Sequence, residues 1–188
     1  MRKMIGLLVL VCAGWAGSVN AATLVFDGGL AGADGVDILG KLYDVRFSDG
    51  TCAGLFSGCD SSDFQFTDVA EAQAASGALL NQVFFGTYDN WPNKTWGCSN
   101  THYAGCYTIT PYAVDNIDNS FLGKTAVNKR LGYGDYIGDV DWGISASTST
   151  SYVFARWAPS PVPLPAAAWL FISAIAGLAG AKRLSRSI

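Results

Sequence analysis

The chain has 188 residues, is half hydrophobic and 14% charged, and carries a formal net charge of −3. All fifteen acidic residues but only seven of the twelve basic ones lie between Ala22 and Pro165, so that part carries a net charge of −8. Because nucleic-acid-binding proteins neutralise phosphates with clustered Lys and Arg, this balance excludes nucleic acid as the expected partner.

The first 21 residues have the pattern of a secretory signal peptide. Arg2 and Lys3 precede an apolar stretch at residues 4–17, and small residues follow up to Ala21. We expect cleavage between Ala21 and Ala22, with the rest of the chain exported across a membrane. An uncleaved membrane anchor is the alternative, and the short apolar stretch argues against it.

Residues 22–158 form the expected exported body, which is long enough for one domain with its own core. Glycines and β-forming residues are spread along it, and Asp rather than Glu supplies nearly all its acids. We expect a strand at residues 22–29, a glycine-rich turn at residues 29–35, and a second strand from residue 41, where apolar and polar residues alternate, up to a turn at Asp49 and Gly50.

One helix is expected, at residues 68–85. Asp68 is placed to cap its N-terminus, with Glu71 three residues later, as in a capping box. The face expected to pack on the sheet consists of Val69, Ala72, Leu79, Leu80 and Val83. Gly77 inside the helix indicates a bend or a close contact.

Residues 86–112 are rich in aromatic and turn-forming residues. Two further strands are expected at residues 132–147 and 151–158, separated by a polar Ser/Thr turn. Together these elements predict an α+β fold, a mainly antiparallel β-sheet with one packed amphipathic helix.

Four cysteines remain once Cys12 leaves with the signal peptide. An even number is expected of an exported domain, and four cysteines allow three pairings. We expect the local pairing, Cys52 with Cys59 and Cys98 with Cys106, which closes two short loops.

The body offers few candidates for metal binding or catalysis. His102 lies midway between Cys98 and Cys106, but a zinc site or a Cys–His pair would need reduced thiolates, which exported cysteines rarely keep. Aspartates at residues 115–118 and 135–141 could supply oxygen ligands to calcium, yet neither group matches an EF-hand loop, and a solvated acidic loop is the better interpretation. We therefore expect no catalytic residue, no cofactor and no metal site.

A binding role is suggested by six aromatic residues in or next to the turn-rich stretch. They are Tyr88, Trp91, Trp96, Tyr103, Tyr107 and Tyr112. Such rings can stack on sugar faces, with nearby Asn side chains as hydrogen-bond partners, which would suit a matrix polysaccharide. The alternative is that the same rings fill the core of the domain.

Residues 159–165 read as a proline-rich linker, with Pro at every second position. Each proline removes a backbone N–H and restricts φ, so we expect an extended segment that joins neither a sheet nor a helix. An extended, accessible segment of this kind is what a peptidase can bind and cut.

The last segment, residues 166–188, is expected to be a transmembrane helix with a basic tail. Its sixteen uncharged residues up to Ala181 would span about 24 Å as a helix, somewhat less than a bilayer core of about 30 Å. Lys182, Arg183 and Arg186 then stop the chain on the cytoplasmic side. A helix buried in the core of the domain is the alternative.

The order of these parts resembles the sorting signal of PEP-CTERM proteins, in the variant whose motif reads VPLPA. The motif is formed by Val162, Pro163, Leu164, Pro165 and Ala166, and the basic stop by Lys182, Arg183 and Arg186. The resemblance implies that an exosortase, a membrane cysteine peptidase, recognises and processes the chain. It also implies export through the inner membrane of a Gram-negative bacterium, transient anchoring there, and then a place at the cell surface or in the extracellular polysaccharide matrix. The basic end departs from the family where Leu184 and Ser185 interrupt it.

The body is similar to other exported PEP-CTERM proteins in three stretches. These are LYDV-x-F-x-DGTC at residues 42–52, GCD with a following DF at residues 58–64, and ALL-x-QVF at residues 78–84. This resemblance implies no activity.

The sequence thus predicts a non-enzymatic, exported surface or matrix protein whose body is a structural or binding module. Two alternatives remain open at this point. One is a carbohydrate-binding protein kept in the membrane by its single helix, and the other is a surface hydrolase of an unrecognised type.

Overall fold

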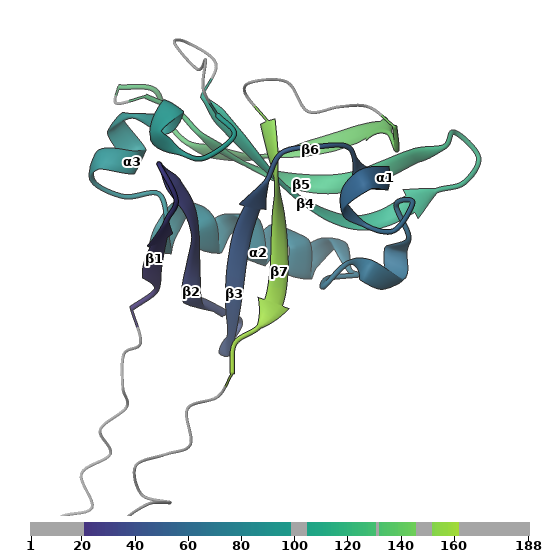
Figure 1. Ribbon diagram of the computed structural model, residues 1–188, viewed down its shortest axis with the longest axis horizontal. Coiled ribbons are helices and arrows are strands. Elements are labelled where there is room, and N and C mark those ends of the chain that lie inside the picture. The colour runs from purple at the N-terminus through teal and green to yellow at the C-terminus, as the bar shows by residue number, and fades with distance from the viewer. Residues whose placement is uncertain (1–20, 99–104, 131, 146–151, 162–188) are drawn as a thin grey trace, which may run out of the picture.

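The computed structural model describes residues 21–98, 105–130, 132–145 and 152–161 (Figure 1). Within these ranges the chain forms seven strands, three α-helices and two short 3-10 helices, labelled η1 and η2. The strands are β1 (Thr23–Phe26), β2 (Leu30–Ile38), β3 (Lys41–Ser48), β4 (Cys106–Asp115), β5 (Ser120–Asn128), β6 (Tyr136–Gly143) and β7 (Tyr152–Pro159). The helices are α1 (Cys52–Leu55), η1 (Ser61–Asp63), α2 (Val69–Gln82), α3 (Thr87–Asn90) and η2 (Pro92–Lys94).

All seven strands belong to one sheet with the order β1-β2-β3-β7-β4-β5-β6. The last strand, β7, lies in the middle, where it pairs antiparallel with β3 and parallel with β4. The other described strand pairs are antiparallel. The predicted α+β class with a mainly antiparallel sheet is therefore confirmed, and the β4–β7 pair makes the sheet mixed.

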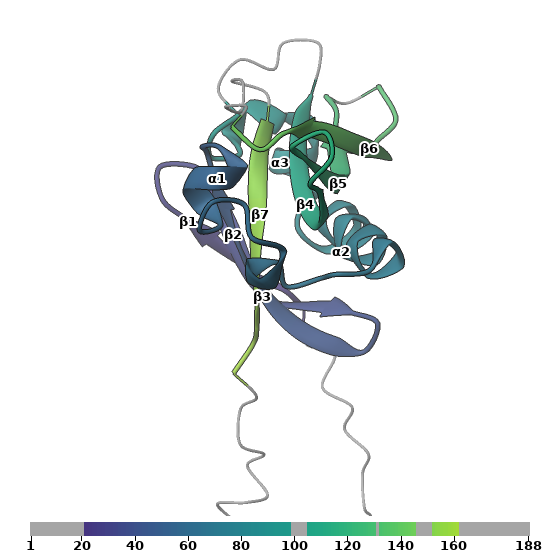
Figure 2. The ribbon, with the colours of Figure 1, turned by 90° about the vertical axis from the view of Figure 1, so that its right-hand side faces the viewer.

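Each face of the sheet is covered by a different segment. Helix α2 lies on one face, and α1 lies on the other side of β7 (Figure 2). The core on the α2 face includes Val45, Ala72, Leu79, Ala126 and Val153. The core on the opposite face includes Cys52, Phe56, Ile109, Phe121 and Phe154, and is closed by the α1–η1 segment.

Helix α2 begins where the sequence predicts. The Asp68 carboxylate accepts hydrogen bonds from the N–H groups of Ala70 and Glu71, which fixes the first turn. The helix ends at Gln82, three residues before the predicted end. The predicted packing face is wrong at Val69, which is 43% exposed.

The predicted turn at residues 29–35 is wrong for all but its first residue, because residues 30–35 belong to β2. A Cβ on Gly32 would lie 2.0 Å from the Val45 carbonyl oxygen, so this glycine allows β2 to approach β3 closely. Gly35 lies where the register shifts between Ala33 and Val36. Glycines in this segment therefore mark a close approach and a bulge, not a chain reversal.

Strands β4 and β5 do not appear among the predicted strands. The first half of β4 lies within the aromatic stretch, and it contains Pro111 next to a register shift. Strand β5 is buried along most of its length, because the two cores lie on its opposite faces. A strand buried on both faces lacks the alternation that identifies half-buried strands.

The pairing of β7 with β3 continues into the predicted linker. Pro159 pairs with Tyr43, and the N–H of Ser160 donates to the Leu42 carbonyl oxygen over 2.9 Å. Since Ser160 makes this ladder bond, the nitrogen of Pro159 points away from β3, a position that tolerates proline. The expectation that Pro159 joins no sheet is therefore wrong.

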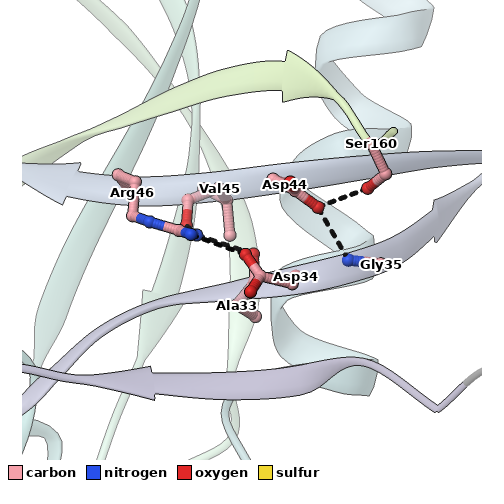
Figure 3. A network of polar contacts seen from close by, with 7 residues as sticks. All are labelled: Ala33, Asp34, Gly35, Asp44, Val45, Arg46 and Ser160. Atoms are coloured by element: carbon pink, nitrogen blue, oxygen red, sulfur yellow. Dashed lines mark hydrogen bonds and ion pairs between the residues drawn. The ribbon is translucent and has the colours of Figure 1, made fainter. Parts of the chain in front are cut away.

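A side-chain contact fastens the same end of β7. The Ser160 hydroxyl donates to Asp44 on β3, and the same carboxylate oxygen accepts the N–H of Gly35 over 3.0 Å (Figure 3). Asp44 thereby ties the last described residues to both β3 and the bulge of β2. The folded body reaches Ser160, immediately before Pro161 and the VPLPA motif.

In the part of the chain that the structure describes, no helix combines the length and the apolar character needed to cross a membrane. The predicted transmembrane helix and basic tail at 166–188 lie outside the described residues.

Candidate functional site

A cavity of about 850 Å³ lies between the β1–β2 turn and the segment from α3 to Cys98. We call it the aromatic pocket. Its walls include Phe26, Asp27, Tyr88, Asn93, Lys94 and Trp96. Cavities of this size accommodate small-molecule ligands.

Backbone contacts hold the two walls of the aromatic pocket together. The N–H of Trp96 donates to the Leu30 carbonyl oxygen over 2.9 Å, and Thr95 forms an isolated parallel bridge with Leu30. A Cβ on Gly29 would lie 2.8 Å from the Lys94 carbonyl oxygen, so the close approach requires glycine there. The spacing between the walls is therefore set by the main chain.

The α3–η2 segment is also tied to the central strands. A disulfide joins Cys98 to Cys106 at the start of β4. Inside the molecule, the side-chain amide of Asn128 on β5 donates to the Tyr88 carbonyl oxygen over 2.8 Å. These contacts restrain the segment that carries Tyr88 and Trp96.

Three aromatic rings line the pocket. Phe26 and Trp96 are 56% and 40% exposed, and the ring of Tyr88 stacks on that of Phe26 with 5.7 Å between centroids. Exposing large rings in a cavity is unfavourable in the free protein, since each retains apolar area in contact with water. A ligand with an apolar face would recover that area by stacking.

Polar groups stand beside the rings. Asp27 can accept hydrogen bonds, Lys94 can donate them, and the amide of Asn93 can do both. A pyranose ring has apolar C–H faces and a rim of hydroxyl groups, so it matches rings flanked by mixed donors and acceptors. The arrangement is suited to binding a sugar.

The structure brings together only part of the predicted aromatic set. Tyr88 and Trp96 line the aromatic pocket, whereas Trp91, 47% exposed, lies outside its lining with the Arg130 guanidinium 5.0 Å from its ring centre. Tyr107 stacks on Tyr152 of β7 at 4.5 Å, away from the pocket. Tyr112 packs against the core on the α2 face, as the alternative interpretation expects, and Tyr103 lies outside the described residues.

Of the three rings that line the pocket, Phe26 is the one that the sequence did not indicate. It stands at the end of an edge strand, distant in sequence from Tyr88 and Trp96, and it reaches them only through the β1–β2 pairing. The available signal in the sequence was an apolar residue directly before Asp27 and two glycines.

Both disulfides join the cysteines of the local pairing. Cys52 is bonded to Cys59, and Cys98 to Cys106. The second bond consumes the thiolates that a zinc site or a Cys–His pair would use, and His102 between them lies outside the described residues.

The candidate calcium ligands do not converge. Among the described residues, no group of three or more side chains is placed to hold a metal ion. Asp139 forms an ion pair with Lys124, and Asp115 accepts the N–H of Ile117 in its own turn. Burial raises the pKa of Asp135, although the N–H of Lys129 donates to its carboxylate and opposes that rise.

The residues predicted for cleavage and sorting lie at the ends of the body or beyond it. Ala21 is exposed, and Ala22 packs against the core on the α2 face. The motif Val162 to Ala166 and the basic residues Lys182, Arg183 and Arg186 lie outside the described residues.

Comparisons of the chain with protein-family models, with curated proteins and with solved structures found no match.

Proposed function

We propose that this protein is an exported surface protein whose body binds carbohydrate through the aromatic pocket. In this proposal, residues 1–21 direct export through the inner membrane of a Gram-negative bacterium. An exosortase then recognises Val162 to Ala166, while the C-terminal helix and Lys182, Arg183 and Arg186 hold the chain in the inner membrane. The processed protein remains at the cell surface or in the extracellular polysaccharide matrix, as a non-catalytic binding module.

Several features of the body support export. Two disulfides are typical of proteins that fold in an oxidising compartment. Ala22, the residue after the proposed cleavage site, packs against the core on the α2 face. Its C-terminal strand ends at Pro159, shortly before the motif.

The geometry of the aromatic pocket carries the carbohydrate proposal. Exposed Phe26 and Trp96 face a cavity with polar groups at its rim, and the walls are held by main-chain contacts. Preformed walls reduce the ordering cost of binding, so stacking energy is retained as affinity.

The position of the pocket fits a body attached by its C-terminus. The start of β1 and the end of β7 lie at one end of the molecule, in the lower part of Figure 1. The β1–β2 turn and α3 lie at the other end. A body held at the end of β7 would therefore present the aromatic pocket away from its attachment.

Affinity electrophoresis of the protein through gels containing the host polysaccharide tests this function. Replacing Trp96 by alanine should weaken retention about tenfold, the effect of losing about 1.4 kcal/mol of stacking. Tyr133→Ala is the matched control, because Tyr133 is 60% exposed but does not line the pocket. Equal retention of wild type and Trp96→Ala would contradict the proposal.

A further inference from the structure

A second cavity, of about 610 Å³, lies where the α1–η1 segment and the chain after it meet β3 and β7. We call it the arginine pocket. Its lining includes Asp44, Arg46, Asp63, Phe66, Arg156 and Trp157. None of these residues lines the aromatic pocket.

Two arginines lie directly opposite each other in this cavity. Arg46 on β3 pairs with Arg156 on β7, so both side chains leave the same face of the sheet. Like charges in directly opposed positions repel each other and destabilise the strand pair. Such a pair needs a compensating negative charge.

The positive charge of Arg46 is compensated by an ion pair within the protein. Its Nη2 lies 2.6 Å from an oxygen of Asp34, and its Nη1 donates to the Val45 carbonyl oxygen over 2.8 Å and to that of Ala33 over 3.3 Å (Figure 3). These contacts hold the guanidinium in place, and Asp34 is already engaged in an ion pair with it.

Arg156 has no such partner. It is exposed, and among the residues that the structure describes it forms no ion pair. Its side chain therefore brings an uncompensated positive charge and five N–H donors to the cavity, in a fork that matches a carboxylate.

The acids of the cavity restrict which anion can bind. Asp44 and Asp63 line the cavity, and Asp34 is paired with Arg46, so three carboxylates accompany the two arginines and a dianion such as phosphate would be repelled. Asp44 accepts both of its protein hydrogen bonds on Oδ1, which leaves Oδ2 to accept from a ligand. Asp63 is exposed at the end of η1 and can accept as well.

We propose that the arginine pocket binds a sugar residue that bears a carboxylate. Its carboxylate would pair with Arg156, and its hydroxyl groups would donate to Asp44 and Asp63. The half-buried side chain of Leu55, which packs against the core on that face of the sheet, supplies apolar surface in the same cavity. The proposal shares a ligand class with the aromatic pocket but rests on different residues.

Binding of three probes to the protein purified from its host tests this site. The probes are trigalacturonate, the neutral trisaccharide maltotriose, and inorganic phosphate, each titrated by ligand-observed NMR. We expect trigalacturonate to bind most tightly, with an affinity that falls as salt is added. Binding of maltotriose or of phosphate as tight as that of trigalacturonate would overturn the proposal.

Variants assign the binding to the pocket. Arg156→Gln should weaken trigalacturonate binding at least tenfold, and Arg156→Lys should retain part of it, because lysine keeps the charge without the fork. Lys41→Gln makes the same charge change at an exposed position outside the pocket and should have no effect.

A readout of stability separates ligand binding from a structural role. Without ligand, Arg156→Gln should not lower the midpoint of thermal unfolding, since it removes a like charge opposite Arg46. Unchanged binding in Arg156→Gln would overturn the proposal. If Trp96→Ala alone abolished trigalacturonate binding, the ligand would occupy the aromatic pocket, which contradicts this site and leaves the proposed function standing.

Discussion

Gly97 connects Trp96 of the aromatic pocket to the disulfide at Cys98. Its φ is +81°, and a Cβ there would lie 2.3 Å from Cγ1 of the buried Val153. The position therefore needs glycine for two reasons, a left-handed backbone and the absence of space.

Replacing Gly97 by alanine should lower the free energy of unfolding by about 3 kcal/mol, from backbone strain and overpacking together. Gly28 is the matched control: it also lines the aromatic pocket and has a φ of +67°, but no atom lies within 4 Å of its Cβ position. Gly28→Ala should cost about 1 kcal/mol, from backbone strain alone. Urea unfolding measures both, and similar losses would mean that Val153 does not confine Gly97.

Single residues could be predicted from sequence only where their role is local. Asp68 caps α2 because the hydrogen bonds it accepts lie within three residues. Phe26 and the opposed Arg46 and Arg156 could not be predicted as site residues, because each meets its partners only through long-range strand pairing.

In helix α2, Gly77 has space for a side chain, unlike Gly97. This glycine was expected to mark a bend or a close contact, but a Cβ there would lie 3.5 Å from Cδ1 of Ile137, an ordinary packing distance. The neighbouring strand therefore leaves room for a methyl group.

Gly77→Ala should raise the free energy of unfolding by up to about 1 kcal/mol, because alanine is the better helix former and its methyl group gains contact with Ile137. Ala74→Gly, the reverse change one turn earlier, should lower it by a similar amount. Thermal unfolding of the two variants gives the comparison. Destabilisation by Gly77→Ala would indicate that the helix needs glycine at this position.

Elements could be predicted where an amphipathic pattern meets a clear boundary. The strands β3 and β6 have alternating residues and nearby turn residues, and α2 has its cap. The glycines of β2 and the proline of β4 concealed strands, because both residue types usually indicate turns. Only the three-dimensional register shows that they accommodate a close approach and a bulge.

At the scale of the whole molecule, β7 connects the two halves of the sheet. The last strand enters the middle of the sheet and joins the β1–β3 half to the β4–β6 half. Sequence patterns identify strands but not their order, so this topology could not be predicted. Since Ser160 is still bonded to β3, only Pro161 separates the folded body from the motif that begins at Val162.

This short separation puts the motif proposed for the peptidase directly beside a folded domain in the sequence. Processing at the motif would release the body without cutting into β7, whose end is secured by Asp44 and the Leu42 carbonyl group. Both proposed carbohydrate sites would remain intact after processing.

The mass of the mature protein isolated from the host envelope and matrix tests the central claim most directly. Export and sorting predict a chain that begins at Ala22 and has lost its C-terminal end, including the basic residues from Lys182 onward. A mature protein that still ends at Ile188 would contradict the account.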